Sequence, residues 1–180
     1  LQRNHQDEQA LLERKITQRF PNDIENCKKK IEKLQADLET LKATDGREFS
    51  IILKDRLFTE RVKAGEFLLV ISRGIAEKNF EITDIGEFRG LKLQLEKNSQ
   101  RSDGVYLNII GSMEYDFILG DSDIGNITRI ENSVNGITGL LAKEKKDLEN
   151  TERQLEAAKG QLCQPFIYEA ELAEKSAKLT

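Results

Sequence analysis

The chain has 180 residues, of which 33% are charged and 6% aromatic, and its formal net charge is −4. This composition favours long helices that bury one narrow stripe over a single large compact core. The lack of a basic surplus argues against a domain that binds nucleic acid over its whole surface, because neutralised phosphates supply most of that affinity. With His5 as the single histidine, histidine-based acid–base catalysis and histidine-ligated zinc sites are disfavoured.

Residues 1–46 are expected to form an N-terminal helical arm. Leu12, Ile16 and Phe20 share one helix face, and Pro21 then predicts a kink because proline removes a backbone donor. After the kink, apolar residues follow the 3-4 spacing that is typical of a coiled coil. These seam positions are Ile24, Cys27, Ile31, Leu34, Leu38 and Leu41.

Residues 47–126 are expected to form a small α+β domain. A strand is predicted at residues 48–54 and a helix at residues 60–72. Period-2 alternation then predicts strands around residues 80–85, 91–95, 105–109 and 115–119. The domain therefore has about five mostly antiparallel strands on one helix, with Leu93 and Ile109 as predicted core positions.

Residues 127–180 are expected to form a C-terminal coiled-coil arm, with Asn126 or Asp123 as its cap and Pro165 as a break before a short terminal helix. The seam repeats at Ile127, Ile130, Val134, Ile137, Leu141, Leu148, Leu155 and Leu162. The predicted fold class is therefore α+β, with a long antiparallel coiled-coil stalk flanking the small sheet domain. The arms pair within one chain, so that Leu41 lies near Ile127 or Ile130.

The two cysteines show neither a metal-binding spacing nor a disulfide framework. In the antiparallel register, Cys27 lies near Glu144 and far from Cys163, so both thiols are expected to be reduced, as in a cytoplasmic protein. No apolar run approaches the length of a membrane span, and no signal-peptide pattern opens the chain. The chain starts without a methionine and ends in mid-pattern, which suggests a piece of a longer polypeptide.

Basic residues gather in one part of the middle domain and form the candidate DNA-contact set. They are Lys54, Arg56, Arg61, Lys63 and Arg73. Residues 47–126 as a whole carry 11 Lys and Arg against 14 Asp and Glu, so the domain itself is not basic. An ordinary solvated helix face is the alternative interpretation.

Two glycine-containing segments lack the features of ligand loops. Residues 121–126 place the glycine one position too early for a calcium loop, whose last ligand would fall on Asn132. Residues 86–90 lack the third glycine and the Lys-Ser/Thr of a phosphate loop, so Gly86 and Gly90 are interpreted as marking a bulge or a close backbone approach. We expect no catalytic residues, metal, cofactor or small-molecule ligand.

Four short phrases carry a resemblance to a known family. They are Phe-Thr-Glu-Arg with a following Ala-Gly-Glu (residues 58–66), Ile-Gly-Glu-Phe-Arg-Gly-Leu (85–91), Gly-Asn-Ile-Thr-Arg-Ile-Glu-Asn (125–132) and Pro-Phe before an acidic helix (165–166). In this order they resemble the C-terminal region of very large proteins of conjugative elements and phages. Those proteins join an adenine-specific DNA methyltransferase to a Swi/Snf-type helicase. The resemblance covers the chain from about Pro21 onward.

The resemblance implies a non-catalytic interaction or positioning module in the DNA-processing machinery of a mobile element. The family's methyltransferase and helicase motifs would lie upstream, and those upstream domains would be the partners. A module that contacts DNA and guides it to the parent enzyme is the alternative, and a free-standing enzyme is disfavoured. Arg129, Gly86 and Gly90 fall in the recurring phrases, and a structural role is expected for them.

Overall fold

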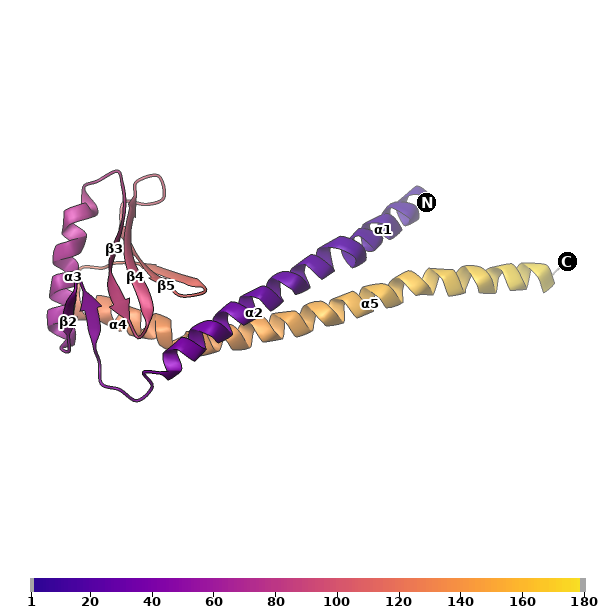
Figure 1. The fold of residues 1–180 in the computed structure, drawn as a ribbon. Helices are drawn as coiled ribbons and strands as arrows, with labels where there is room; N and C mark the ends of the chain where they lie inside the picture. Colours follow the sequence, from indigo (N-terminus) through magenta and orange to yellow (C-terminus); the bar gives the residue numbers. More distant parts are fainter. Residues whose placement is uncertain (1, 179–180) are drawn as a thin grey trace. The chain divides into compact units, whose positions relative to one another are not determined.

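The computed structural model describes the backbone of residues 2–178 and the side chains of residues 4–162. The fold is α+β, with helices and one antiparallel six-stranded sheet (Figure 1). The chain divides into two compact units, one of Leu1–Ile31 with Ala142–Thr180 and one of Glu32–Leu141. The second unit contains the predicted middle domain of residues 47–126 and extends beyond it at both ends.

The N-terminal part of the first unit contains a change in helix type. Helix α1 (Gln2–Arg14) leads into a π-helix, η1 (Lys15–Arg19), and then into α2 (Phe20–Lys42). In η1 the N–H of Phe20 donates to the carbonyl of Lys15, five residues back. Pro21 has no N–H to donate, so the regular ladder is already interrupted at this point. The predicted kink near Pro21 therefore corresponds to a π-helical segment without a break in the chain of helices.

Most of helix α5 (Ile137–Lys178), from residue 142 onward, belongs to the first unit, and the helix continues past Pro165. A proline removes one backbone bond from a helix and often bends it, and here the helix does not end. The expected break and separate terminal helix are not present in the backbone. Within this unit Cys27 lies beside Glu144 and Asp147, as the antiparallel register predicts. Burial raises the pKa of the Cys27 thiol, and the two carboxylates raise it further. The side chain of Cys163 lies outside the described residues.

The second unit is built on the sheet, whose strand order is β2-β1-β3-β4-β5-β6. The strands are β1 (Ile51–Leu53), β2 (Arg56–Phe58), β3 (Phe80–Phe88), β4 (Leu91–Asn98), β5 (Val105–Ile110) and β6 (Glu114–Ile118). All neighbours pair antiparallel. The strand β2 was not predicted. It follows β1 through a tight turn in which Lys54 and Asp55 have φ values of 50° and 66°, the left-handed conformations of a two-residue hairpin loop.

Two helices in this unit are α3 (Arg61–Ala76) and α4 (Asp123–Asn135). The cap of α4 is Ser122, whose hydroxyl accepts from the N–H of Gly125 at 3.1 Å. The prediction of Asp123 or Asn126 as the cap is therefore wrong. Asn126 is 1% exposed and serves a different contact. Gly136 ends α4, and α5 begins at the next residue.

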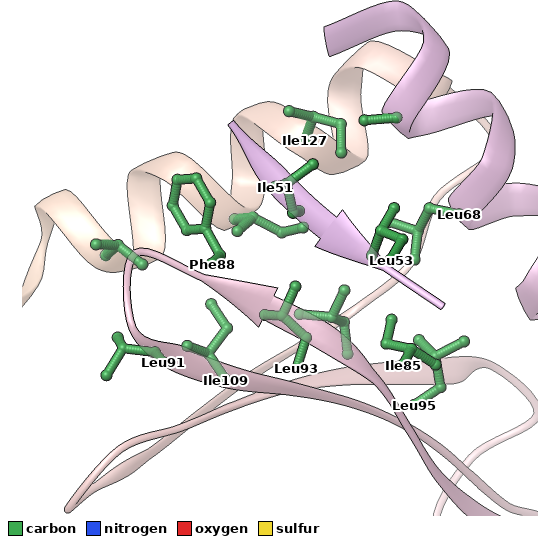
Figure 2. Close-up of a cluster of buried hydrophobic side chains, with 14 of the residues drawn as sticks. Ile51, Leu53, Leu68, Ile85, Phe88, Leu91, Leu93, Leu95, Ile109 and Ile127 are labelled. Carbon is green, nitrogen blue, oxygen red and sulfur yellow. The ribbon is translucent and has the colours of Figure 1, made fainter. Parts of the chain in front are cut away.

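The core of this unit fills the layer between the sheet and the helices. Figure 2 shows Ile127 of α4 and Leu68 of α3 directed toward the same layer as Leu93 and Ile109 of the sheet. Leu93 and Ile109 are both 0% exposed, so these two predicted core positions are confirmed. Leu34 and Leu41, near the end of α2, belong to the same cluster of buried residues.

Candidate interaction surface

Of the five basic residues predicted to contact DNA, Arg61 is held most firmly by other residues. Its Nε and Nη2 donate to the two carboxylate oxygens of Glu131 on α4, at 2.7 and 3.1 Å. Its guanidinium also lies 4.8 Å from the ring centre of Phe49. The hydrogen bonds to Glu131 raise the pKa of Arg61. This side chain therefore joins α3 to α4, and its donors to Glu131 are not free for an external phosphate.

The other four are exposed and divided between the β1–β2 hairpin and α3. Lys63 pairs with Glu60 at 3.4 Å, and Arg56 lies 5.4 Å from the ring centre of Phe67. Lys54 occupies the hairpin turn, and Arg73 lies in the last turn of α3. Among residues 4–162, no carboxylate pairs with Lys54, Arg56 or Arg73 within 4.0 Å. DNA contact by this set stays a prediction.

Gly86, in the second phrase of the resemblance, allows two strands to approach closely. A Cβ on this residue would lie 1.8 Å from the carbonyl oxygen of Ile52 on β1, a distance at which no side chain fits. The pairing of β3 with β4 also shifts by one residue between Asp84 and Gly86, which is a β-bulge. The interpretation of this glycine as a bulge and close approach is confirmed.

The same phrase ends in a turn that caps α2. Arg89 and Gly90 have φ values of 50° and 84° and form the β3–β4 turn. From this turn the guanidinium of Arg89 donates to the hydroxyl of Thr44 (2.8 Å), the carbonyl of Leu41 (3.0 Å) and the carboxylate of Asp45 (2.8 Å). The last carbonyls of a helix lack partners within the helix. The carbonyl of Leu41 accepts from Arg89 as well as from Thr44, and Arg89 thereby fixes the end of α2 against the sheet.

The third phrase, at the start of α4, fixes the segment that enters this helix. The side-chain amide of Asn126 accepts from the N–H of Gly120 at 2.8 Å and donates to its carbonyl at 3.0 Å. Arg129 donates to the carbonyl of Ile118 at the end of β6, at 2.8 Å. A Cβ on Gly65 of α3 would lie 2.3 Å from the carbonyl oxygen of Asp123, so α3 and α4 are in backbone contact there. The first three phrases therefore have structural roles, and the side chains of the fourth, at residues 165–166, lie outside the described residues.

Asp37 of α2 is the polar residue of this unit that the sequence reasoning missed. It is 1% exposed and accepts from the backbone N–H groups of Ser112 (2.6 Å) and Met113 (3.0 Å) and from the Tyr115 hydroxyl (2.7 Å). Burial and then this carboxylate raise the pKa of Tyr115 well above its ordinary value. A carboxylate at position 37, among the apolar seam residues, was the available signal.

A cleft of about 490 Å³ lies beside the loop between α2 and β1. Its lining includes Arg61 with Glu131 and Arg89 with Asp45, and both pairs are already formed within the protein. Ile52 and Leu57 form an apolar part of the wall. The charged groups best placed to hold a small ligand are therefore engaged in internal contacts.

The face of the sheet that alternates with the core positions has a different character, and we call it the outer face. It includes the cross-strand row Ile82, Glu96, Tyr106 and Ile118. Large apolar side chains on this face reach solvent, with Phe80 61%, Ile82 47% and Ile118 42% exposed. Ile52 and Leu57, which pair across β1 and β2, are exposed as well. Phe80 and Ile82 lie two positions apart on this face of β3, and neighbouring exposed apolar groups of this kind are typical of protein-binding surfaces.

Charged residues cross the same face in a network centred on Arg101. Its guanidinium pairs with Asp116 (2.7 Å) and Glu96 (3.3 Å) and lies 3.7 Å from the ring centre of Tyr106. A second pair joins Asp84 to Lys92 at 2.8 Å, and this hydrogen bond is the main cause of the lowered pKa of Asp84. Acids outnumber bases on the outer face, since Glu87 and Glu114 are also exposed there.

Within the described part of the chain, His, Cys, Asp and Glu side chains form no group of three or more that could hold a metal ion. The same part contains no helix with the length and apolar character needed to cross a membrane. Comparison with protein-family models, with curated proteins and with solved structures found no match for this chain.

Proposed function

We propose that this chain is a non-catalytic interaction and positioning module of a larger DNA helicase and methyltransferase protein of a mobile element. The sequence resemblance supports the parent class, and the outer face of the sheet supports the interaction role. In this proposal the seams of α2 and α5 pair as a coiled-coil stalk that carries the sheet unit. The upstream domains of the parent are its partners, and the location is cytoplasmic.

The observation that carries the interaction role is the contrast between the polar groups and the apolar ones. Several polar side chains of the sheet unit form hydrogen bonds between its own elements, among them Asp37, Arg89 and Asn126. Phe80, Ile82 and other apolar side chains instead remain on the outer face. Their exposure costs stability in water, and burial against a partner would recover it.

The proposal is tested by substitution on the outer face within the parent protein. Phe80→Ser with Ile82→Ser should leave the thermal melting of the isolated chain close to that of the unsubstituted chain. The same pair should reduce DNA unwinding or methylation by the parent. Val70→Ser on α3 is the matched control, because Val70 is 60% exposed and lies outside the sheet. Unchanged parental activity in the outer-face variant would contradict the proposal.

DNA contact is the second candidate, and one observation favours it: Lys54, Arg56 and Arg73 are exposed and lack carboxylate partners in the described residues. A titration with duplex and with single-stranded DNA across a salt series tests it. A guiding role predicts micromolar affinity that falls as salt rises, and a further loss when these three residues are changed to glutamate. A protein-interaction role predicts no change on these reversals.

A further inference from the structure

The two edge strands of the sheet differ in length, and the longer one offers more backbone groups to a partner. At one edge, β2 has three residues, and its Phe58 packs on Phe67 of α3 with ring centres 5.2 Å apart. At the other edge, β6 has five residues and pairs only with β5 among the described strands. An uncovered edge strand presents unpaired backbone groups to which another extended chain can bind.

Two backbone bonds fix which groups of β6 point outward. Leu119 N–H donates to the carbonyl of Val105, and Gly111 N–H donates to that of Met113, at 2.9 and 2.8 Å. Residues 113 and 119 therefore face β5, and in an antiparallel ladder every second residue does the same. Tyr115 and Phe117 then bond to β5, whereas Glu114, Asp116 and Ile118 direct their backbone groups away from it.

The contact of Arg129 agrees with this assignment of outward-facing backbone groups, and it occupies one of them. Its Nη1 reaches the carbonyl of Ile118 from α4, so that carbonyl must face outward. The N–H of Ile118, and both the N–H and the carbonyl of Glu114 and Asp116, remain for an incoming strand.

The side chains of β6 define what such a strand would carry. Tyr115 and Phe117 point to the core side and are only partly buried, so apolar residues of an added strand would complete their burial. Glu114 and Asp116 point to the outer face and are exposed. Asp116 already pairs with Arg101 at 2.7 Å, whereas Glu114 forms no ion pair within 4.0 Å among residues 4–162. In cross-strand pairs, opposite charges stabilise the ladder and like charges destabilise it, so the added strand would place Lys or Arg beside Glu114.

We propose that β6 is a docking edge for an extended segment of a protein partner in which apolar residues alternate with Lys or Arg. The proposal rests on the interaction role proposed above and names the chemistry of the partner. The segment adds a seventh strand by backbone pairing, and its alternating side chains set the specificity.

The acids of β6 disfavour two other occupants. If two copies of this chain paired through the whole of β6 in antiparallel register, Glu114 of each copy would lie opposite Ile118 of the other and would gain no basic partner. Phosphates of DNA would meet the carboxylate of Glu114. A basic, alternating segment of protein meets neither obstacle.

The test uses this chain with three synthetic peptides. One alternates Lys and Val over seven residues, the second replaces each Lys with Glu, and the third carries proline at the central Val. Hydrogen exchange followed by NMR should show that the first peptide slows exchange at the N–H groups of Glu114, Asp116 and Ile118 by about tenfold or more at saturation. The second and third peptides should leave these amides unchanged.

Two variants of one residue separate the backbone from the side chain. Asp116→Pro removes an outward N–H without touching the ladder to β5, because an edge strand tolerates proline at such a position. Asp116→Ala removes the same carboxylate and keeps the N–H. The alanine variant should bind the Lys peptide at least about tenfold more tightly than the proline variant, a difference of one decade in Kd. Thermal melting checks that both remain folded.

A third comparison tests the charge. Glu114→Lys should weaken binding of the Lys peptide severalfold, whereas Glu87→Lys, an exposed acid on β3 within the sheet, should change it little. Equal binding by the proline and alanine variants, or no protection of the three amides, would overturn the proposal. Dimerisation of the chain through β6 would also overturn it, because a second copy would then be the occupant.

The outcomes remain separable from those of the proposed function. If the peptide does not bind at β6 while Phe80→Ser with Ile82→Ser still impairs the parent protein, the interaction role is supported and docking at β6 is rejected. If the peptide binds at β6 while the parent loses no activity on Asp116→Pro, the edge stands and its role in the parent falls.

Discussion

Different kinds of polar contact stabilise the second unit, which contains the sheet (the sheet unit), and the first unit, which is helical (the helical unit). In the sheet unit, buried groups bond to residues far away in sequence, as Asp37 does to Ser112, 75 positions on. In the helical unit, ion pairs such as Glu25–Lys29 and Glu149–Arg153 are exposed and join residues four apart on one helix. Exposed pairs of this kind contribute a few tenths of a kcal/mol each. The sheet unit should therefore be far more sensitive to single substitutions.

The largest effect is expected from Leu93→Ala in the core of the sheet. Leu93 is fully buried among β-strand and helix side chains, and the cavity should lower the free energy of unfolding by about 2–5 kcal/mol. Urea denaturation followed by circular dichroism measures this loss. Leu155→Ala, at a half-buried position of α5, should cost clearly less, and an equal cost at both sites would contradict the comparison.

Gly86→Ala should also destabilise the sheet, by about 1–3 kcal/mol or more. The new Cβ would meet the carbonyl oxygen of Ile52 at 1.8 Å, so β1 or β3 must shift. Gly139→Ala in α5 is the matched control, because nothing lies within 4 Å of its Cβ position. There alanine should stabilise the helix by about 0.5–1 kcal/mol. The melting temperature should fall in Gly86→Ala and rise in Gly139→Ala.

Asp37→Asn should cost about 1–3 kcal/mol, since an amide keeps the shape but loses an acceptor and leaves buried donors unpaired. The amides of Ser112 and Met113 should exchange hydrogen faster in the variant. Glu39→Gln on the same helix is a suitable control, because Glu39 is exposed and its ion pair, with Lys42, is exposed as well. Protection of the two amides at the original level would show that Asp37 does not hold the β5–β6 turn.

The smallest effect concerns pH. The folded state raises the pKa of Tyr115 above its ordinary value of 10.0, so the unfolded chain releases this proton first. The stability that Tyr115 contributes is then complete below about pH 10 and is lost as the pH rises further. Unfolding measured from pH 9 to 11 should show a decline that is shallower in Tyr115→Phe. A decline of equal slope in both proteins would assign it to other groups.

The sequence predicted those parts of the fold that depend on local periodicity. The alternation of apolar and polar residues identified β3 to β6 and the two core positions, because each pattern spans several residues of one strand. The strand β2 has three residues and offers too short a pattern. The contacts of Asp37 and Arg89 depend on partners about 44 to 78 positions away, and no local pattern encodes such pairings.

The candidate site was predictable to a smaller degree for the same reason. Clustering in sequence indicated the basic residues, but the partner of Arg61 is Glu131, 70 positions on. The strand at 115–119 was expected, whereas its place at the edge of the sheet follows from strand order, which long-range pairing decides. The cap of α4 was missed because serine, aspartate and asparagine are about equally suited to this position.

The π-helix η1 lets the first helices of the chain share one continuous stripe. A π turn holds one residue more than an α turn, so η1 accommodates one extra residue in an otherwise continuous helix. In a purely α-helical segment, each extra residue would turn the positions beyond it by about 100° around the axis. The wider turn absorbs that rotation, so the partly buried Leu12 and Ile16 stay in line with Phe20 and Ile24. Removing one residue from positions 15–19 should therefore convert η1 into α-helix and leave this alignment unchanged.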